Sequence, residues 1–155
     1  MKHRISLFIG SACYIGFIAG APGTYASLAT TLAFFLVYRI NHRILPELHL
    51  SVFCLTTLIG VMVAARVSRA SGKEDPSFIV IDEVAGQLLT FLFVPVHWWT
   101  LAGGTLLFRI FDIWKPYPLR NLEHLKNGVG VMADDIGAGI YANLVLQVIV
   151  RLLAR

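Results

Sequence analysis

Arginine, lysine and carboxylate side chains stand close together in the second half of a chain that is otherwise very apolar. Arg109, Asp112 and Lys115 fall within seven residues, and Asp134 and Asp135 follow about twenty residues later. Charges beside long hydrophobic runs are costly, so they indicate a functional site. Carboxylates are the ligands that Mg²⁺ takes in proteins, and arginine can hold phosphate oxygens with two parallel hydrogen bonds. These residue types therefore predict a site for a metal and a phosphate.

The remaining acidic residues point to the same part of the chain. Of the nine Asp and Glu residues, all except Glu47 fall between Glu74 and Asp135. The predicted metal ligands are Asp82, Glu83, Asp112, Asp134 and Asp135. The predicted phosphate-binding residues are Thr24, Lys73, Arg109 and Lys115. The five carboxylates, Arg109 and Lys115 are together the predicted catalytic residues.

Each of these motifs also has a purely structural explanation. Arg109 and Asp112 are three residues apart, so they could form an ion pair on one helical face. Asp135 could cap the start of the last helix. Asp82 and Glu83 could be acidic residues favoured at a helix N-terminus by the helix dipole.

A short turn near the N-terminus has two interpretations as well. The residues Pro22-Gly23-Thr24, with Ser27, could hold a phosphate at the start of a helix. The same pattern is typical of an ordinary turn followed by a helix cap.

The composition favours a multi-pass membrane protein over a small helical domain with an unusually large core, and we expect one all-α domain, 1–155, built as a membrane helical bundle. Hydrophobic residues make up 57% and charged residues 14%, whereas soluble domains carry about 25% charged residues. The net charge is +4 without a run of basic residues, which favours anionic lipid headgroups over nucleic acid as partners. Cys13 and Cys54 lie in apolar runs without metal-site spacing, so they are predicted to be buried small hydrophobic residues.

Apolar segments between breakers give the candidate membrane helices. They are residues 26–40, 50–67, 84–94 with 98–113, and 136–153, after a short apolar helix at 5–18. The segment 50–67 comes closest to the ~20 residues that span a bilayer. Residues 5–18 could also be a signal peptide; we prefer a retained helix, because residues 21–24 look like part of the site.

Pro95 interrupts the third segment, which predicts either one kinked helix or a helical hairpin. We prefer the hairpin, because it returns Arg109 and Asp112 to the membrane face that holds Asp82 and Glu83. All site residues, and Asp75, then lie on one face.

Arg66, Arg69 and Lys73 follow the segment 50–67 and indicate that this face is cytoplasmic. Arg39 and Arg43 fall on the opposite face, against the usual excess of basic residues on the cytoplasmic side.

Four blocks of sequence resemble the phosphatidylglycerophosphatase A family of bacterial membrane lipid phosphatases. The longest are Phe108-Arg109-Ile110-Phe111-Asp112-Ile113-Trp114-Lys115-Pro116-Tyr117-Pro118 and Gly128-Val129-Gly130-Val131-Met132-Ala133-Asp134-Asp135 with Ala138-Gly139. The shorter ones are Ala21-Pro22-Gly23-Thr24 with Ser27-Leu28, and Ile79-Val80-Ile81-Asp82-Glu83 with Gly86. The chain departs from the family pattern at Ala26 and at Asn127-Gly128, which affects the loops rather than a charged group.

The resemblance implies Mg²⁺-dependent hydrolysis of phosphatidylglycerophosphate to phosphatidylglycerol and phosphate at the bacterial inner membrane. The nucleophile, water or an aspartate, and the oligomeric state stay open at this point. One alternative is a phosphatase for a soluble phosphomonoester. Another is a small transporter or non-enzymatic membrane protein, which would show charges at mid-helix depth and an internal repeat.

Overall fold

The computed structural model describes residues 2–73, 76–122, 125 and 128–154. These residues form α-helices and one short 3-10 helix, without a strand, so the predicted all-α class is confirmed. The elements are α1 (Lys2–Gly10), η1 (Ile15–Phe17), α2 (Pro22–Asn41), α3 (Pro46–Ser71), α4 (Ile81–Thr90), α5 (Trp98–Trp114), α6 (Leu119–Leu122) and α7 (Val129–Leu153). The apolar run at 5–18 therefore contains the end of one helix and a separate 3-10 turn.

Two helices in the described part of the chain, α3 and α7, are long and apolar enough to cross a membrane. The ranges 50–67 and 136–153 lie inside them. The range 26–40 lies inside α2, which is twenty residues long but is not one of these two helices. The ranges 84–94 and 98–113 correspond to the separate helices α4 and α5, which residues 91–97 connect.

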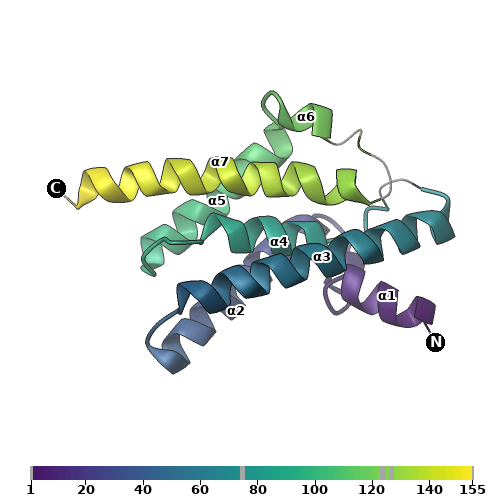
Figure 1. Cartoon of the computed structure of the whole chain (residues 1–155), viewed down its shortest axis with the longest axis horizontal. Coiled ribbons are helices and arrows are strands. Elements are labelled where there is room, and N and C mark those ends of the chain that lie inside the picture. The colour runs from purple at the N-terminus through teal and green to yellow at the C-terminus, as the bar shows by residue number, and fades with distance from the viewer. Residues whose placement is uncertain (1, 74–75, 123–124, 126–127, 155) are drawn as a thin grey trace.

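The short helix α4 occupies the centre of the molecule. It contacts α2, α3, α5 and α7, and in Figure 1 it lies between the long helices α3 and α7. Most of its residues are buried, including the polar residues Asp82, Gln87 and Thr90. At its C-terminal end, the Asn143 side-chain amide of α7 donates hydrogen bonds to the backbone oxygens of Thr90 and Leu92, at 3.0 and 2.8 Å. Buried carbonyls at this helix end are thereby satisfied.

Helices α4 and α7 cross at two glycines that let their backbones touch. A Cβ atom added to Gly139 would lie 2.5 Å from the backbone oxygen of Gly86. A Cβ atom added to Gly86 would lie 2.6 Å from the backbone oxygen of Asp135. Small residues allow this close approach of two helices. The crossing therefore sets how near α4 lies to the acidic residues of α7.

Asp135 does not cap the last helix, which begins earlier than the expected residue 136. Helix α6 lies between α5 and α7, and α7 begins at Val129, so Asp135 lies within the helix rather than at its start. Gly128 precedes α7 with φ 77°, in the left-handed region, and the built Cβ at this glycine would lie 2.5 Å from the backbone nitrogen of Ala65. Packing of the first turn of α7 against α3 therefore extends the helix into the glycine-rich segment.

One further expectation is corrected by the structure. Cys13 and Cys54 are exposed rather than buried. An apolar run does not show which face of a helix is buried when both faces are apolar, and this explains the error for Cys54 in α3.

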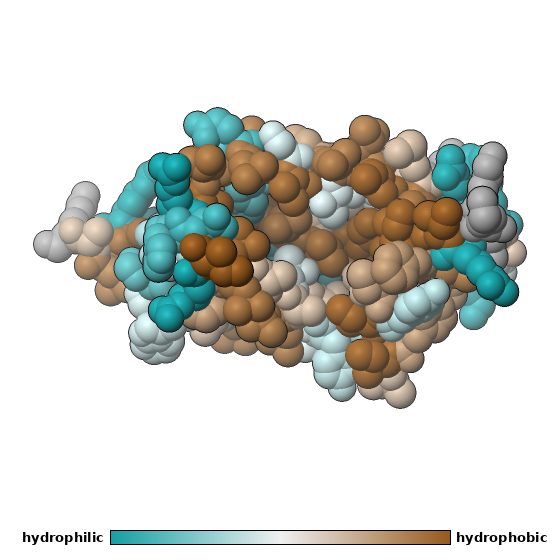
Figure 2. Space-filling view, turned by 90° about the horizontal axis from the view of Figure 1, so that it is seen from below, coloured by the Kyte–Doolittle hydropathy of each residue, from teal (hydrophilic) through white to brown (hydrophobic). Residues whose placement is uncertain are grey.

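The surface is apolar over a wide area. Large hydrophobic side chains are exposed on α2, α3, α5 and α7, for example Leu32, Leu55, Leu106 and Leu144. Figure 2 shows hydrophobic residues across the middle of the molecule and hydrophilic residues gathered near the two ends of its long axis. Apolar patches of this extent mark surfaces that contact another apolar phase or a partner.

Candidate functional site

Three carboxylates from two helices meet at the start of α4. One oxygen each from Asp82, Glu83 and Asp135 lies within 4.8 Å of the others. Asp82 and Glu83 are in the first turn of α4, and Asp135 is in the second turn of α7. Oxygen ligands of Mg²⁺ at ~2.1 Å lie up to ~4.2 Å apart across the ion. The three oxygens could therefore surround such an ion after a small movement.

The pKa of Glu83 and the unpartnered oxygen atoms of the carboxylate group are consistent with a site for a cation. Burial raises the pKa of Glu83, and the charge of Asp112 raises it further, against the hydrogen bond from Asp82 and the charge of Arg109. Glu83 Oε2 and Asp135 Oδ2 are buried and have no hydrogen-bond partner among the described residues. Buried carboxylates without partners are expensive, and a bound cation would remove that cost.

Arg109 links the two helices of the α4–α5 pair. Its Nη1 atom is 2.7 Å from Asp112 Oδ2 and 3.9 Å from Glu83 Oε1. The expected ion pair on one face of α5 is therefore present, and Arg109 also approaches the carboxylate group. Its Nε atom is buried without a partner among the described residues. This leaves a guanidinium donor for an acceptor that the protein itself does not provide.

Lys115 approaches the same end of α7 from the end of α5. It is the C-cap of α5, in the left-handed conformation with φ 46°, and its Nζ atom is 2.6 Å from Asp134 Oδ2. Asp134 is buried, and its Oδ1 atom has no partner among the described residues. Asp112 and Asp134 are outside the set of three converging oxygens, and each instead pairs with a cation.

The turn at the start of α2 packs directly on this group. A Cβ atom added to Gly23 would lie 1.9 Å from Glu83 Oε1 and 3.1 Å from Arg109 Nη1. The hydroxyl of Ser27 donates to the backbone oxygen of Gly23 at 2.9 Å, so it is already used. Thr24 follows Gly23 in the first turn of α2 and is half-buried. The predicted Pro22-Gly23-Thr24 turn thus lies beside Glu83.

The structure does not bring every predicted residue to the group. Lys73 lies just after α3 and is exposed, and within the described residues no contact joins its ammonium group to the carboxylates. Asp75 lies outside the described residues. The sequence did not predict the close Gly86–Gly139 crossing, because the spacing of residues along the chain does not show which distant residues are in contact. Gln87 lies one turn after Glu83, is fully buried, and has no partner for its amide atoms in the described structure. Its spacing of four residues from Glu83 was the sequence signal that could have placed it on the same helical face.

Comparisons with known proteins agree with the blocks that contain these residues. The chain is 34% identical to a protein of Haemophilus influenzae named phosphatidylglycerophosphatase A, over 93% of this chain and 85% of that protein. It is also 34% identical to a protein of the same name from Escherichia coli, over 87% and 80%. A protein of Bacteroides thetaiotaomicron named "Putative phosphatidylinositol-3-phosphatase" is 35% identical, over 93% and 92%. No solved structure matches the chain.

The family match includes every element that carries the site. The family model for phosphatidylglycerophosphatase A matches residues 8–150, which extend from the end of α1 almost to the end of α7. The match thus contains Gly23, the acidic residues of α4 and α7, and the two cations of α5. The chain therefore belongs to the phosphatidylglycerophosphatase A family.

Proposed function

We propose that this protein is a Mg²⁺-dependent phosphatase that hydrolyses phosphatidylglycerophosphate to phosphatidylglycerol and inorganic phosphate. One observation carries the proposal: three carboxylates meet beside Arg109, with the Lys115–Asp134 pair next to them in sequence at Asp135, in a helical molecule with an apolar surface. The family is one of phosphoric monoester hydrolases, so an enzyme is favoured over a transporter or a non-enzymatic membrane protein.

We place the protein in the bacterial inner membrane, with the site on the cytoplasmic face. The exposed apolar side chains and the two long apolar helices support this placement. Gly128 at the start of α7 packs against Ala65 of α3, so the basic end of α3 lies on the same side as the start of α7. The exposed residues Arg66, Arg69 and Lys73 at this end favour the cytoplasm. A diacyl substrate stays in the bilayer, so its headgroup meets the enzyme at the membrane surface.

Asp82, Glu83 and Asp135 would hold the Mg²⁺ ion. When bound, Mg²⁺ supplies positive charge against the phosphoryl oxygens and can orient a water molecule. Asp112 and Asp134 have a different part in this proposal. Their contacts of 2.7 and 2.6 Å hold Arg109 and Lys115 in place, so they position the cations rather than ligate the metal.

Arg109 and Lys115 would bind the phosphate of the lipid headgroup. The unpartnered Arg109 Nε atom can donate to a phosphate oxygen, and the ammonium group of Lys115 adds a point charge. In the hydrolysis, a water oxygen forms a bond to phosphorus while the bond from phosphorus to the glycerol oxygen breaks. The glycerol oxygen takes up a proton and leaves as a hydroxyl group of phosphatidylglycerol. Fixed positive charges facing the phosphoryl oxygens lower the barrier of this step.

A second substrate has a specific observation in its favour. The Bacteroides thetaiotaomicron relative carries a name that refers to phosphatidylinositol 3-phosphate. Both lipids present a phosphomonoester at the membrane surface, so the proposed groups could serve either. Phosphatidylglycerophosphate is our first choice, because the family and two relatives are named for it.

The test is phosphate release by the purified protein in detergent micelles. The substrates are phosphatidylglycerophosphate, phosphatidylinositol 3-phosphate and the soluble phosphomonoester glycerol 3-phosphate, each with Mg²⁺ and with a chelator. We expect Mg²⁺-dependent release from phosphatidylglycerophosphate, loss of release in Asp134→Asn, and full activity in Glu47→Gln, whose carboxylate is exposed on α3. Absence of release from this lipid would refute the proposed substrate, and release in the chelator would refute the role of the metal.

A further inference from the structure

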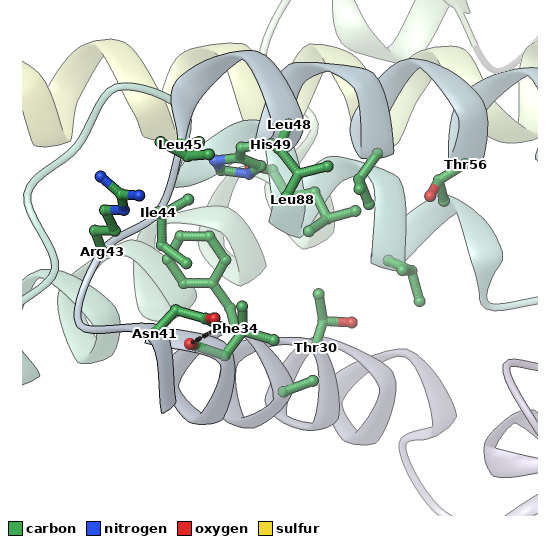
Figure 3. A pocket seen from close by; sticks show the side chains of 14 residues that line it. Thr30, Phe34, Asn41, Arg43, Ile44, Leu45, Leu48, His49, Thr56 and Leu88 are labelled. Carbon is green, nitrogen blue, oxygen red and sulfur yellow. Dashed lines mark hydrogen bonds between the residues drawn. The ribbon is translucent and has the colours of Figure 1, made fainter. Parts of the chain in front are cut away.

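A cavity of about 570 Å³ lies between α2 and α3, with α4 on its inner side, where Val84 next to Glu83 is one of the lining residues. Figure 3 shows the side chains that line it. Its walls are mainly apolar, with Phe34, Leu48 and Leu88 among the lining residues. The volume is within the range of ~300–1,000 Å³ typical of ligand sites. An apolar cavity that opens on an apolar surface fits a hydrocarbon chain better than a soluble metabolite.

The position of the cavity along the helices matches one leaflet of a bilayer. On α2 the lining residues extend from Thr30 to Asn41, and on α3 from Leu45 to Thr56. Each range covers about 16 Å at 1.5 Å per residue, which is close to half of the ~30 Å hydrocarbon core. Gly23, which contacts the carboxylate group, is at the other end of α2. The cavity begins about 10 Å from Gly23 along α2, so most of it lies in the half of the bilayer opposite the proposed catalytic face.

A basic side chain stands at the outer end of this cavity. Arg43 is exposed and lines the cavity, and no ion pair of its guanidinium occurs among the described residues. In Figure 3 Arg43 and Thr56 lie at opposite ends. Asn41, beside Arg43, already donates its side-chain amide to the backbone oxygen of Val37 at 2.9 Å. An arginine at this level can bind a lipid phosphate with two hydrogen bonds.

Fixed contacts hold the walls of the cavity in place. His49 of α3 is buried, and its Nε2 atom is 2.9 Å from the backbone oxygen of Leu88 in α4. The His49 ring also packs on the Phe34 ring of α2, with centroids 4.9 Å apart. These two contacts connect all three helices that form the cavity. The space between them is therefore held open by the fold.

We propose that this cavity binds one acyl chain of an anionic phospholipid from the leaflet opposite the carboxylate group, with the lipid phosphate on Arg43. This inference rests on the membrane placement in the proposed function, but not on the phosphatase reaction. The substrate is a poorer occupant, because its phosphate would lie at the Gly23 end of α2, about 27 Å along the helix from Asn41 and out of reach of Arg43. The site also gives Arg43 a partner on the membrane face where basic residues are usually fewer.

Native mass spectrometry of the purified, delipidated protein tests this proposal. The probes are phosphatidylglycerol and phosphatidylcholine with identical acyl chains. We expect the wild type to retain one phosphatidylglycerol in preference to phosphatidylcholine. Arg43→Ala should reduce this preference about fivefold, as expected for one basic side chain at a membrane surface. Ala33→Phe, which fills the cavity, should reduce retention of both lipids.

Matched variants separate this site from general effects. Arg39→Ala removes an exposed arginine of the same end that does not line the cavity, and Ala102→Phe enlarges an exposed alanine of α5. Both should retain phosphatidylglycerol as the wild type does, and so should Arg109→Ala at the carboxylate group. Equal retention of the two lipids by the wild type would overturn the proposal, as would equal losses in Arg39→Ala and Arg43→Ala, or a loss in Arg109→Ala.

The activity assay keeps the two proposals distinct. A protein that retains the lipid but releases no phosphate would contradict the proposed function and leave the lipid site standing. A protein that hydrolyses phosphatidylglycerophosphate but shows no lipid preference would contradict the lipid site and leave the proposed function standing.

Discussion

Gly23→Ala tests whether the start of α2 positions the Glu83 carboxylate. Gly23 is the second residue of α2 and is buried. Its added Cβ atom would lie 1.9 Å from Glu83 Oε1, whereas ordinary contacts begin at 3.4 Å, so the oxygen must move by about 1.5 Å. Metal ligands tolerate displacements of only ~0.2 Å. The substitution should therefore directly disturb the proposed Mg²⁺ ligand Glu83.

The expected loss is large for activity and small for stability. A misplacement of ~1 Å in a catalytic group can cost ~100-fold in rate, so we expect kcat/KM to fall about 100-fold, equivalent to ~2.7 kcal/mol. The free energy of unfolding should stay within ~1 kcal/mol of the wild type, because alanine is the better helix former. The atom that must move is the end of a flexible side chain rather than backbone.

The assay combines phosphate release with thermal unfolding in the same detergent. Gly103→Ala is the matched control, because a Cβ atom there would meet only Leu146 Cδ1 at 4.0 Å. This control should keep full activity and an unchanged or higher Tm. Wild-type kcat/KM in Gly23→Ala would refute the argument, and so would a collapse of its Tm, since then the contact would support the fold rather than the site.

Three further predictions follow from the contacts of the site. Gly139→Ala should lower the free energy of unfolding by ~1–3 kcal/mol, because its Cβ atom would meet the Gly86 backbone oxygen at 2.5 Å; thermal unfolding beside Gly103→Ala measures this, and an unchanged Tm would contradict the close crossing. Mg²⁺ should raise the Tm of the wild type by mass action but should not raise the Tm of Asp135→Asn. In chelator, Asp135→Asn should have a higher Tm than the wild type, because one repelling charge is gone. Equal increases of Tm with Mg²⁺ in the two proteins would exclude Asp135 as a ligand. Lys115→Met should cost up to ~3 kcal/mol by leaving Asp134 buried and unpaired, and adding Asp134→Asn should restore most of it in a double-mutant cycle; additive losses would show that the pair is not coupled.

Much of the site could be predicted from residue types and their order. Charged residues in an apolar chain need partners, so Arg109, Asp112 and the acidic pairs were recognisable before any distance was known. Pro95 indicated the turn that allows Arg109 to approach Glu83, at 3.9 Å in the structure. These signals are local, because they depend on composition, spacing and breakers.

The sequence did not predict which carboxylates converge on one point and which pair closely with Arg109 and Lys115. All five were equivalent candidates by type, but only Asp82, Glu83 and Asp135 bring an oxygen each to one point, whereas Asp112 and Asp134 make the short contacts to Arg109 and Lys115. The start of α7 was misplaced because glycine usually ends helices, whereas here Gly128 fits against the Ala65 backbone and the helix begins directly after it. Such outcomes depend on contacts between segments that are far apart in sequence.

The glycine crossing of α4 and α7 also determines which parts of the molecule can open. Because Gly139 meets the Gly86 backbone directly, no side-chain rotation can separate these helices, and they should move as one body with their carboxylates. Phe108 of α5 is fully buried against Gly86 of α4 and Ala138 of α7, so the second half of α5 is also packed on this body. The backbone positions that carry Asp82, Glu83 and Asp135 should therefore keep their spacing when other parts of the molecule move.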